Sequence, residues 1–378
     1  MPVTLALAAV LTWLSCAAGA ALPGVPAPPQ VPARSYVMVD FHSGEVLADH
    51  DADLRLEPAS LTKIMTVYVA AREMAAGRIS LDDQTMVSEK AWRTSGSRMF
   101  IEVGSTVSIR DLFKGIIVQS GNDASVALAE HVSGTEEVFA SLMNHYAAEL
   151  GMTGTSFGNS TGLPHPETYS TARDQVLLGA ALLREFPEIY GWFSDIEFTY
   201  NDITQQNRNR LLTLDSSVDG IKTGHTEAAG YCLASSAERN GMRLIAVVMG
   251  ASSEEKRTDA SRSLLNYGFR FYETHKLYDA EEKVAESRVW KGEDEMLSVG
   301  FSKPLYITIP RGYYEDLDAS VSMDASIVAP VTRGEVRGEV TLSFKGKPLR
   351  SVPLTALHDV APGGIVTRTL DSVWMWFE

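Results

Sequence analysis

Three short motifs lie along the chain in an order that suits a serine nucleophile. They are Ser60-Leu61-Thr62-Lys63, Ser120-Gly121-Asn122 and Lys222-Thr223-Gly224. A serine hydroxyl is a weak nucleophile near neutral pH and needs an adjacent base. The first motif supplies both groups, because on a helix Lys63 lies about one turn from Ser60. Together the motifs offer a nucleophile, its base and an anion-binding strand, which predicts acyl-transfer chemistry.

Lys63 can serve as a base only if its pKa is lowered. A free lysine has a pKa of about 10.4, and burial or a second cation nearby lowers that value. Lys222 is the candidate for the second cation. The alternative is that Ser60 merely bonds backbone N–H groups at a helix start and that Lys63 is solvated. A further Ser-x-x-Lys match at Ser253–Lys256 lies in a charged stretch typical of a surface turn.

The second motif is expected where a helix meets a turn. There, Ser120 would relay a proton and the Asn122 amide would hold the peptide carbonyl of a substrate. The alternative is a simple turn, since Ser, Gly and Asn all favour turns. Lys222–Gly224 follows the turn residues Asp219-Gly220 and is predicted to run along an exposed strand edge.

A peptide can add to such an edge through main-chain hydrogen bonds. Gly224 would let that backbone approach closely. Lys222 and Thr223 would then meet a substrate carboxylate.

Composition excludes several classes of protein. The 378 residues are 45% hydrophobic with a net charge of −15, which is typical of a globular chain of about two domains without the basic field of a nucleic-acid-binding protein. There is no His-Glu-x-x-His run, no Gly-x-x-x-x-Gly-Lys-Thr loop and no cysteine cluster. We therefore expect no metal, no cofactor and no nucleic-acid partner.

Residues 1–20 are predicted to be a secretory signal peptide, with an apolar stretch over 5–14 and the small residues Ala18-Gly19-Ala20. No Lys or Arg precedes the stretch, and Cys16 leaves a lipoprotein site as an alternative. An uncleaved spanning anchor is disfavoured, because a bilayer needs about 20 apolar residues. Cleavage after Ala20 would leave Cys232 as the lone cysteine, so no internal disulfide could form.

The remaining chain divides into segments that differ in composition and in predicted secondary structure. Residues 21–34 are proline-rich and are predicted to be an extended linker. Residues 35–275 are predicted to open with a hairpin at 36–48 and to carry a probable central strand at 244–249. A further strand is expected at 231–234, and helices are expected at 58–74, 112–132, 135–150, 177–186 and 259–272.

The C-terminal third changes character. Residues 276–362 contain short strands, such as 305–309 and 340–344, separated by Gly, Pro and charged residues, which predicts a small all-β domain. In residues 363–378, apolar side chains share one helical face: Val366, Leu370, Val373, Trp374 and Phe377. With Trp374 and Trp376 this predicts an amphipathic helix that anchors the chain in a membrane interface. The alternative is a helix docked on the protein's own core.

The three motifs, their order and their wide spacing resemble the penicilloyl serine transferases. The segments 207–226 and 264–274, and the β-rich tail with its amphipathic helix, are similar to the low-molecular-mass penicillin-binding proteins of the type-5 group, which are D-alanyl-D-alanine carboxypeptidases. The resemblance implies an α/β (α+β) serine β-lactamase/DD-peptidase-like domain, with an antiparallel sheet flanked by helices. A small all-β domain and the amphipathic helix would follow it.

The resemblance also implies residue roles. Ser60 would become the acyl-enzyme, Lys63 would accept its proton, and Ser120 would pass the proton to the leaving D-alanine. The backbone N–H groups of Ser60 and His225 would form the oxyanion hole. Asn122, Lys222, Thr223, Gly224 and Arg257 would bind substrate. Lys256 and Arg262 lie close enough in sequence to be alternatives to Arg257.

The implied reaction removes the terminal D-alanine from peptidoglycan pentapeptide stems, and β-lactam antibiotics would acylate the same serine. The implied location is periplasmic, with peripheral attachment to the inner membrane through the C-terminal helix. A class A β-lactamase is disfavoured, because its Glu-x-x-Leu-Asn signature is absent. The β-rich tail disfavours a cross-link endopeptidase, and the complete motif set disfavours a noncatalytic peptidoglycan-binding module.

Overall fold

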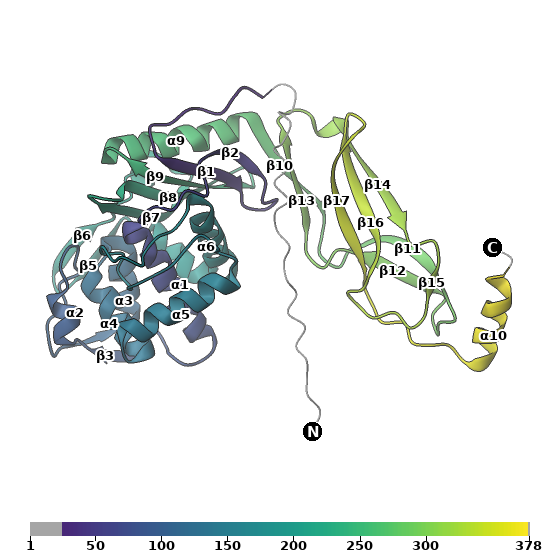
Figure 1. Cartoon of the computed structure of the whole chain (residues 1–378), viewed down its shortest axis with the longest axis horizontal. Helices are drawn as coiled ribbons and strands as arrows, with labels where there is room; N and C mark the ends of the chain where they lie inside the picture. The colour runs from purple at the N-terminus through teal and green to yellow at the C-terminus, as the bar shows by residue number, and fades with distance from the viewer. Residues whose placement is uncertain (1–24, 377–378) are drawn as a thin grey trace.

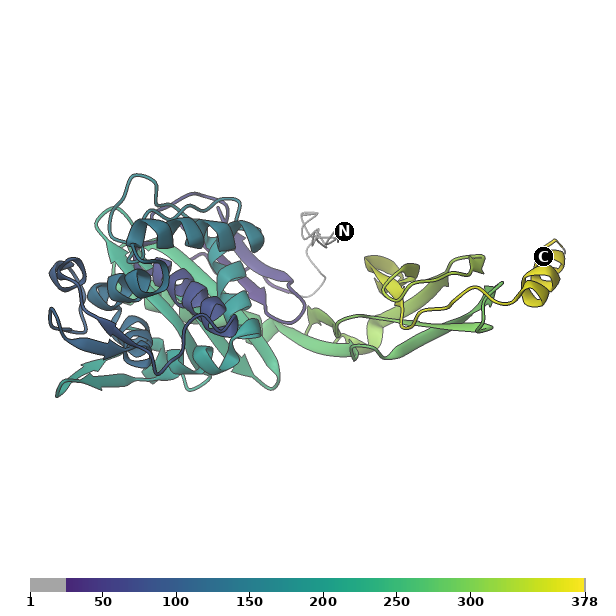
Figure 2. The ribbon, with the colours of Figure 1, turned by 90° about the horizontal axis from the view of Figure 1, so that it is seen from below.

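The computed structural model describes residues 25–376, so the predicted signal peptide, with Cys16, lies outside the described residues. Figure 1 shows a large N-terminal domain of helices around a sheet, joined to an elongated β domain that carries a helix at its far end. Figure 2 shows the same two domains side by side along the long axis of the molecule. This arrangement agrees with the predicted fold class.

A five-stranded antiparallel sheet forms the centre of the N-terminal domain, in the order β2-β1-β9-β8-β7. Strand β9 lies in its middle, and the side chains of Val247 and Val248 are both fully buried. Because successive side chains point to opposite faces, burial on both faces explains the uninterrupted apolar run. The strands are β1 Ser35–Asp40, β2 Val46–His50, β7 Val218–Thr226, β8 Gly230–Arg239 and β9 Met242–Ala251.

Helices cover both faces of this sheet, and each face has its own apolar core (Figure 1). On one face, α9 (Glu254–Phe271) packs closely because it presents Gly268, where a Cβ would lie 2.5 Å from Leu244. On the other face lie α1 (Thr62–Ala75) and α6 (Ala172–Glu185), and Gly179 of α6 faces Ile221. Small helix residues therefore set how near each layer approaches the sheet.

The helix predicted across 112–132 is interrupted, and the interruption lies at the second motif. α3 (Ile109–Lys114) passes into a π-helical turn, Gly115–Gln119, and α4 (Asn122–Ser133) begins after a break. At the break Ser120 has a φ of 66°, and the Gly121 N–H bonds the Gly115 carbonyl at 3.0 Å. The single helix predicted across 112–132 is therefore wrong, whereas the expectation that the second motif lies where a helix meets a turn is confirmed.

The other helices of the domain agree with the expected helical middle, whereas four short strands between them were not predicted. They are α2 Glu89–Arg93, α5 Glu136–Glu149, α7 Pro187–Gly191 and α8 Leu211–Leu214, with the short strands β3 Gln84–Met86, β4 Thr106–Ser108, β5 Glu197–Tyr200 and β6 Ile203–Gln206. α5 begins with Thr135 as its N-cap, whose side chain accepts from the Val138 N–H.

Residues 25–34, predicted as part of a linker, pack along the domain. Val25 and Val31 contact the core beneath α9. The Tyr267 hydroxyl donates to the Pro26 carbonyl at 2.9 Å, and the Arg34 N–H donates to the Met249 carbonyl at 3.0 Å. The prolines favour an extended backbone, as expected, but the interspersed valines supply apolar contacts that the proline content alone does not suggest.

The C-terminal domain is all-β, as predicted, and begins where α9 ends. β10 (Tyr272–Tyr278) pairs with β13 (Leu305–Pro310), and a six-stranded sheet has the order β14-β16-β17-β12-β11-β15. Its strands are β11 Lys283–Trp290, β12 Met296–Gly300, β14 Leu317–Met323, β15 Ile327–Val328, β16 Val336–Phe344 and β17 Lys347–Ala356. A separate apolar core, including Val299 and Leu342, holds it together.

A hydrogen-bonded cluster joins the two domains. The fully buried Asp40, at the end of β1, accepts from the Thr274 hydroxyl of β10 at 2.7 Å. The Ser43 and Thr308 hydroxyls lie 2.6 Å apart, and Thr308 lies 2.8 Å from Thr274. Because these four side chains bond one another from both domains, the junction is a fixed contact rather than a free tether.

The terminal helix α10 (Ile365–Trp374) turns its apolar side chains outward. Val373 and Trp374 are 56% and 61% exposed, whereas Asp371 is buried and accepts from the Lys291 N–H. The apolar face therefore does not dock on the described core, contrary to the alternative considered above, and Phe377 lies outside the described residues. Within residues 25–376, none of the helices has the length and apolar character needed to cross a bilayer.

Candidate active site

Ser60 sits in a 3-10 turn, Ala59–Leu61, that leads directly into α1. Ala59 has a φ of 48°, in the left-handed region that a residue with a side chain seldom adopts. This turn is held by close packing: a Cβ on Gly162 would lie 1.8 Å from the Ala59 carbonyl oxygen. Ser60 remains partly exposed while both of its neighbours are buried, so the packing presents its hydroxyl at the surface.

Lys63 is fully buried and points its amine at the nucleophile. Its Nζ bonds Ser60 Oγ at 3.1 Å, Asn122 Oδ1 at 2.6 Å and the Thr161 carbonyl at 2.5 Å. Burial, with a further contribution from the Arg208 cation, lowers the pKa of Lys63 to about 7. A lysine with that pKa is partly neutral at physiological pH and can take the serine proton.

The second motif lies against the first. Ser120 is almost fully buried, and its Oγ has no hydrogen-bond partner among the described residues. Asn122 starts α4 and joins the two motifs through Lys63, while its Nδ2 donates to the Ser95 carbonyl at 2.6 Å. An amide nitrogen has two hydrogens, so one donor of Asn122 stays available for a substrate carbonyl.

Strand β7 carries the third motif along the edge of the sheet, as predicted. A Cβ on Gly224 would lie 2.9 Å from the Pro58 carbonyl and 3.2 Å from the Ser60 nitrogen. Only a residue without a side chain lets the strand lie this close to the nucleophile.

Lys222 is buried, and its Nζ bonds only the neighbouring Thr223 carbonyl, at 3.3 Å, among the described residues. Burial and the surrounding cations Lys63, Arg208 and Arg257 lower its pKa. A substrate carboxylate would supply the negative charge that these cations lack.

Arg257 is the cation that the structure brings to this strand. It lies in the first turn of α9, where its Nη1 donates to the Gly224 carbonyl at 3.2 Å and its guanidinium lies 5.6 Å from the Tyr231 ring centre. Burial lowers the pKa of Arg257. Lys256 and Arg262, the alternatives from sequence, are both exposed. Arg257 therefore supports β7 from behind and adds positive charge to the site.

Of the remaining residues considered from the sequence, His225 lies at the site, whereas the second Ser-x-x-Lys match lies away from it. His225 is exposed and its ring lies tilted against that of Tyr231, with ring centres 4.0 Å apart, at the end of β7 where the oxyanion hole is expected. The second Ser-x-x-Lys match has a purely structural role, because Ser253 is the N-cap of α9 and its Oγ accepts from the Lys256 N–H at 3.1 Å.

Four contributing residues were not identified from the sequence. The Thr161 carbonyl bonds Lys63, and the Asn159 side chain holds the Thr161 and Gly162 N–H groups at 3.1 and 2.7 Å. Asp123 accepts from the Met99 and Phe100 N–H groups at 3.0 and 2.9 Å, which ties the loop beside the site to α4. The available signal was local: Asn159 and Gly162 form a turn pattern, and Asp123 directly follows a motif.

The fourth contributor is the Arg208 cation, whose charge lowers the pKa of both Lys63 and Lys222. Within residues 25–376, no group of three or more His, Cys, Asp or Glu side chains is arranged to hold a metal ion.

Together, a serine beside a buried low-pKa lysine, a buried serine hydroxyl without a partner among the described residues and a cationic edge strand are the arrangement expected of a serine acyl-transfer enzyme. Two family descriptions match the chain: "D-alanyl-D-alanine carboxypeptidase" over residues 23–253 and "Penicillin-binding protein 5, C-terminal domain" over residues 272–362. The chain belongs to the D-alanyl-D-alanine carboxypeptidase family of serine peptidases, as the resemblance predicted.

Individual relatives match between 64% and 93% of this chain. D-alanyl-D-alanine carboxypeptidase DacC of Escherichia coli (strain K12) is 43% identical over 93% of this chain and 90% of its own length. Penicillin-binding protein 5 of Haemophilus influenzae has a similar structure, with a TM-score of 0.86 and 41% identity over 89% of this chain and 99% of its own. Ampicillin-bound penicillin-binding protein D2 of Listeria monocytogenes matches 64% of this chain and 100% of its own, at a TM-score of 0.59 and 31% identity.

Proposed function

We propose that the protein is a serine-type D-Ala-D-Ala carboxypeptidase that acts on peptidoglycan stem peptides and is acylated by β-lactam antibiotics. The observation that carries this function is the pairing of Ser60 Oγ with Lys63 Nζ at 3.1 Å, with the pKa of Lys63 near 7. The family and the similar relatives support the same activity. Removal of the terminal D-alanine would leave tetrapeptide stems and so gives the enzyme a role in cell-wall biogenesis.

The arrangement suggests the following acylation step. The peptide adds to β7, and its terminal carboxylate meets Lys222 and Thr223. Ser60 Oγ attacks the penultimate D-alanine carbonyl while Lys63 Nζ takes the hydroxyl proton. The backbone N–H groups of Ser60 and His225 stabilise the oxyanion. The C–N bond then breaks, and the proton passes through Ser120 to the leaving nitrogen.

Water completes the reaction by attacking the ester carbonyl. The ester bond to Ser60 breaks, the serine hydroxyl regains a proton, and the shortened peptide leaves as a carboxylic acid. With penicillin the same attack opens the lactam ring, but the leaving nitrogen stays attached to the acyl group. The deacylation signature Glu-x-x-Leu-Asn of class A β-lactamases is absent from the sequence, so we expect this acyl-enzyme to persist.

The decisive experiment measures D-alanine release from a diacyl-Lys-D-Ala-D-Ala tripeptide by the purified chain. Release that prior penicillin abolishes, and that the Ser60→Ala variant lacks, is the expected result. Unchanged release by Ser60→Ala would overturn the catalytic assignment. Covalent penicillin labelling without any D-alanine release would instead favour the endopeptidase or a peptidoglycan-binding role.

We further propose a periplasmic location, with α10 lying in the inner-membrane interface. The support is the exposed apolar face of this helix, including Trp374, the exposed Trp376 just after the helix, and the signal-like residues 1–20. Deletion of residues 363–378 should abolish sedimentation with lipid vesicles. Val373→Glu, on the apolar face, should weaken sedimentation, whereas the neighbouring Ser372→Glu adds the same charge elsewhere and should not. Vesicle binding that survives the deletion would refute this anchor.

A further inference from the structure

The side chain of Glu136 links two helices to the loop beside Lys63, and none of the three motifs contains it. Glu136 lies in the first turn of α5, and its side chain is 12% exposed. Its Oε1 accepts from the N–H and from the hydroxyl of Ser160, at 3.1 and 2.7 Å. Its Oε2 pairs with Lys90 Nζ of α2 at 3.1 Å. Each oxygen of this carboxylate therefore has its own partner.

Ser160 directly precedes Thr161, whose carbonyl accepts from Lys63 Nζ at 2.5 Å. Ser160 is fully buried, and its own carbonyl accepts from the Thr66 hydroxyl of α1 at 2.6 Å. Its N–H and hydroxyl are bonded to α5, as described above. Bonds to two helices thus fix the place in the chain from which Thr161 extends its carbonyl toward the lysine.

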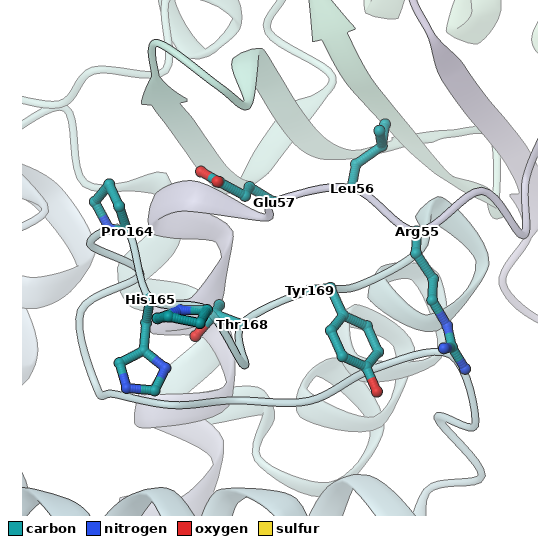
Figure 3. Close-up of a pocket in the computed structure, with 8 residues that line it drawn as sticks. Arg55, Leu56, Glu57, Pro164, His165, Thr168 and Tyr169 are labelled. Carbon is teal, nitrogen blue, oxygen red and sulfur yellow. The ribbon is translucent and has the colours of Figure 1, made fainter.

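The other side of this loop borders an open hollow. Beyond Gly162, the residues Pro164 and His165 line a pocket of about 510 Å³. Figure 3 shows this loop and the segment of Glu57 on opposite sides of the hollow. The Asn159 side chain bonds other residues of the same loop, so it shapes the turn but does not tie it to the helices. The hydrogen bonds to α1 and α5 supply the support that the pocket side does not give.

The Glu136 carboxylate also acts on Lys63 through its charge. Burial and the Arg208 cation lower the pKa of Lys63, whereas the carboxylates of Asp123 and Glu136 raise it. The Lys222 cation faces the same amine. Removal of the charge of Glu136 should therefore favour the neutral lysine, because a nearby anion stabilises the protonated form.

We propose that Glu136 is a positioning residue for acylation, which holds the Thr161 carbonyl against the Lys63 amine. It acts through Ser160, and its negative charge sets the pH range in which the lysine serves as a base. This inference rests on the proposed function, because it concerns the base of the proposed acylation step.

The alternative is that Glu136 merely stabilises the start of α5, as acidic residues in a first helical turn do. Glu137 provides the comparison. It lies in the same first turn and also pairs with Lys90, at 2.9 Å, but its side chain is 76% exposed. A helix-start effect should thus be shared by both residues, whereas an effect on the base should belong to Glu136.

The test measures acylation of the full-length chain by a fluorescent penicillin from pH 5.5 to 9. Glu136→Gln keeps an oxygen for the Ser160 donors but loses the charge, so the midpoint of the rate profile should fall by about half a unit, while the plateau at high pH is kept. Glu136→Ala also loses the hold on the loop, so its plateau rate should fall at least about fivefold. Glu137→Gln removes the same charge from the same helix start and should keep the midpoint and the plateau of the wild type.

An unchanged or raised midpoint in Glu136→Gln would overturn the proposal, and so would a wild-type plateau in Glu136→Ala. A midpoint that moves equally in Glu137→Gln and Glu136→Gln would indicate a helix-start effect and would overturn it too. If the Tm of Glu136→Ala shows that this variant is unfolded, the midpoint of Glu136→Gln still decides, because a purely structural contact would not move it. A wild-type chain that penicillin acylates at no pH would instead reject the proposed function.

Discussion

The burial of Lys63 gives a quantitative expectation for the pH dependence of acylation. An ordinary lysine with a pKa of about 10.4 is neutral in about one molecule in 2,500 at pH 7. The buried Lys63, with a pKa of about 7, is neutral in about half of the molecules. The difference corresponds to about 5 kcal/mol, at about 1.4 kcal/mol per pKa unit. Without the burial and the Arg208 charge that lower this pKa, the fraction of enzyme with a competent base would fall about a thousandfold.

The direction in which the acylation rate changes with pH follows from the role of the Lys63 amine. The base acts when it is deprotonated, so acylation should rise with pH and level off above the pKa of Lys63. Between pH 6 and pH 8 the neutral fraction rises from about one-tenth to about nine-tenths for a pKa of about 7. The assay is stopped-flow acylation by a fluorescent penicillin from pH 5.5 to 9, a range in which the penicillin carboxylate stays ionised. Because Lys63 and Lys222 interact, the observed midpoint belongs to the pair.

Substitution of Arg208 tests the same assignment by changing the pKa of Lys63. Its cation contributes to the lowered pKa of Lys63, although burial contributes more. Arg208→Ala should therefore move the midpoint of the rate profile upward by less than about one unit, while Arg208→Lys, which keeps the charge, should leave it in place. A wild-type profile still rising steeply at pH 9, or a downward shift in Arg208→Ala, would refute the assignment of Lys63 as the base.

Two further substitutions test the close contacts of the site. Gly224→Ala should reduce the acylation rate at least tenfold, because its Cβ would lie 2.9 Å from the Pro58 carbonyl and displace β7 from Ser60. Gly191→Ala, where a Cβ meets nothing within 4 Å, is the control, and equal rates in both variants would contradict the argument. Ser120→Ala should slow turnover by at least tenfold with little change in Tm, since Ser120 Oγ has no hydrogen-bond partner among the described residues. A large fall in Tm would point to a structural role instead.

Much of the site could be predicted because side-chain chemistry identifies it. The serine, the lysines and the edge-strand glycine belong to motifs whose residue types are required by the reaction. The carbonyl of Thr161 could not be predicted in this way, since every residue has a carbonyl and only the fold decides which one faces Lys63. Arg257 was distinguishable from Lys256 and Arg262 only by burial, which depends on how α9 is rotated against the sheet.

In the fold, too, some features could be predicted from the sequence and others depend on tertiary packing. The central strand β9 was predictable, because an apolar run of its length must be covered on both faces. The turn at Ser120 was predictable from the turn-forming residues of its motif, but the left-handed backbone of Ser120 and the π-helical turn before it were not. Residues 25–34 likewise pack on the core beneath α9 through two valines, which proline content does not indicate. Periodicity thus predicts regular elements better than their interruptions.

The cluster of Asp40, Ser43, Thr274 and Thr308 joins the two domains by hydrogen bonds, and a rotation between the domains would break them. If α10 rests on the membrane as proposed, the β domain holds Ser60 at a nearly constant distance from the membrane surface. The enzyme would then reach only the part of the cell wall at that distance. Stem peptides nearer to or farther from the bilayer would escape trimming. The location of trimmed stem peptides within the cell wall would then depend on four side chains remote from the catalytic serine.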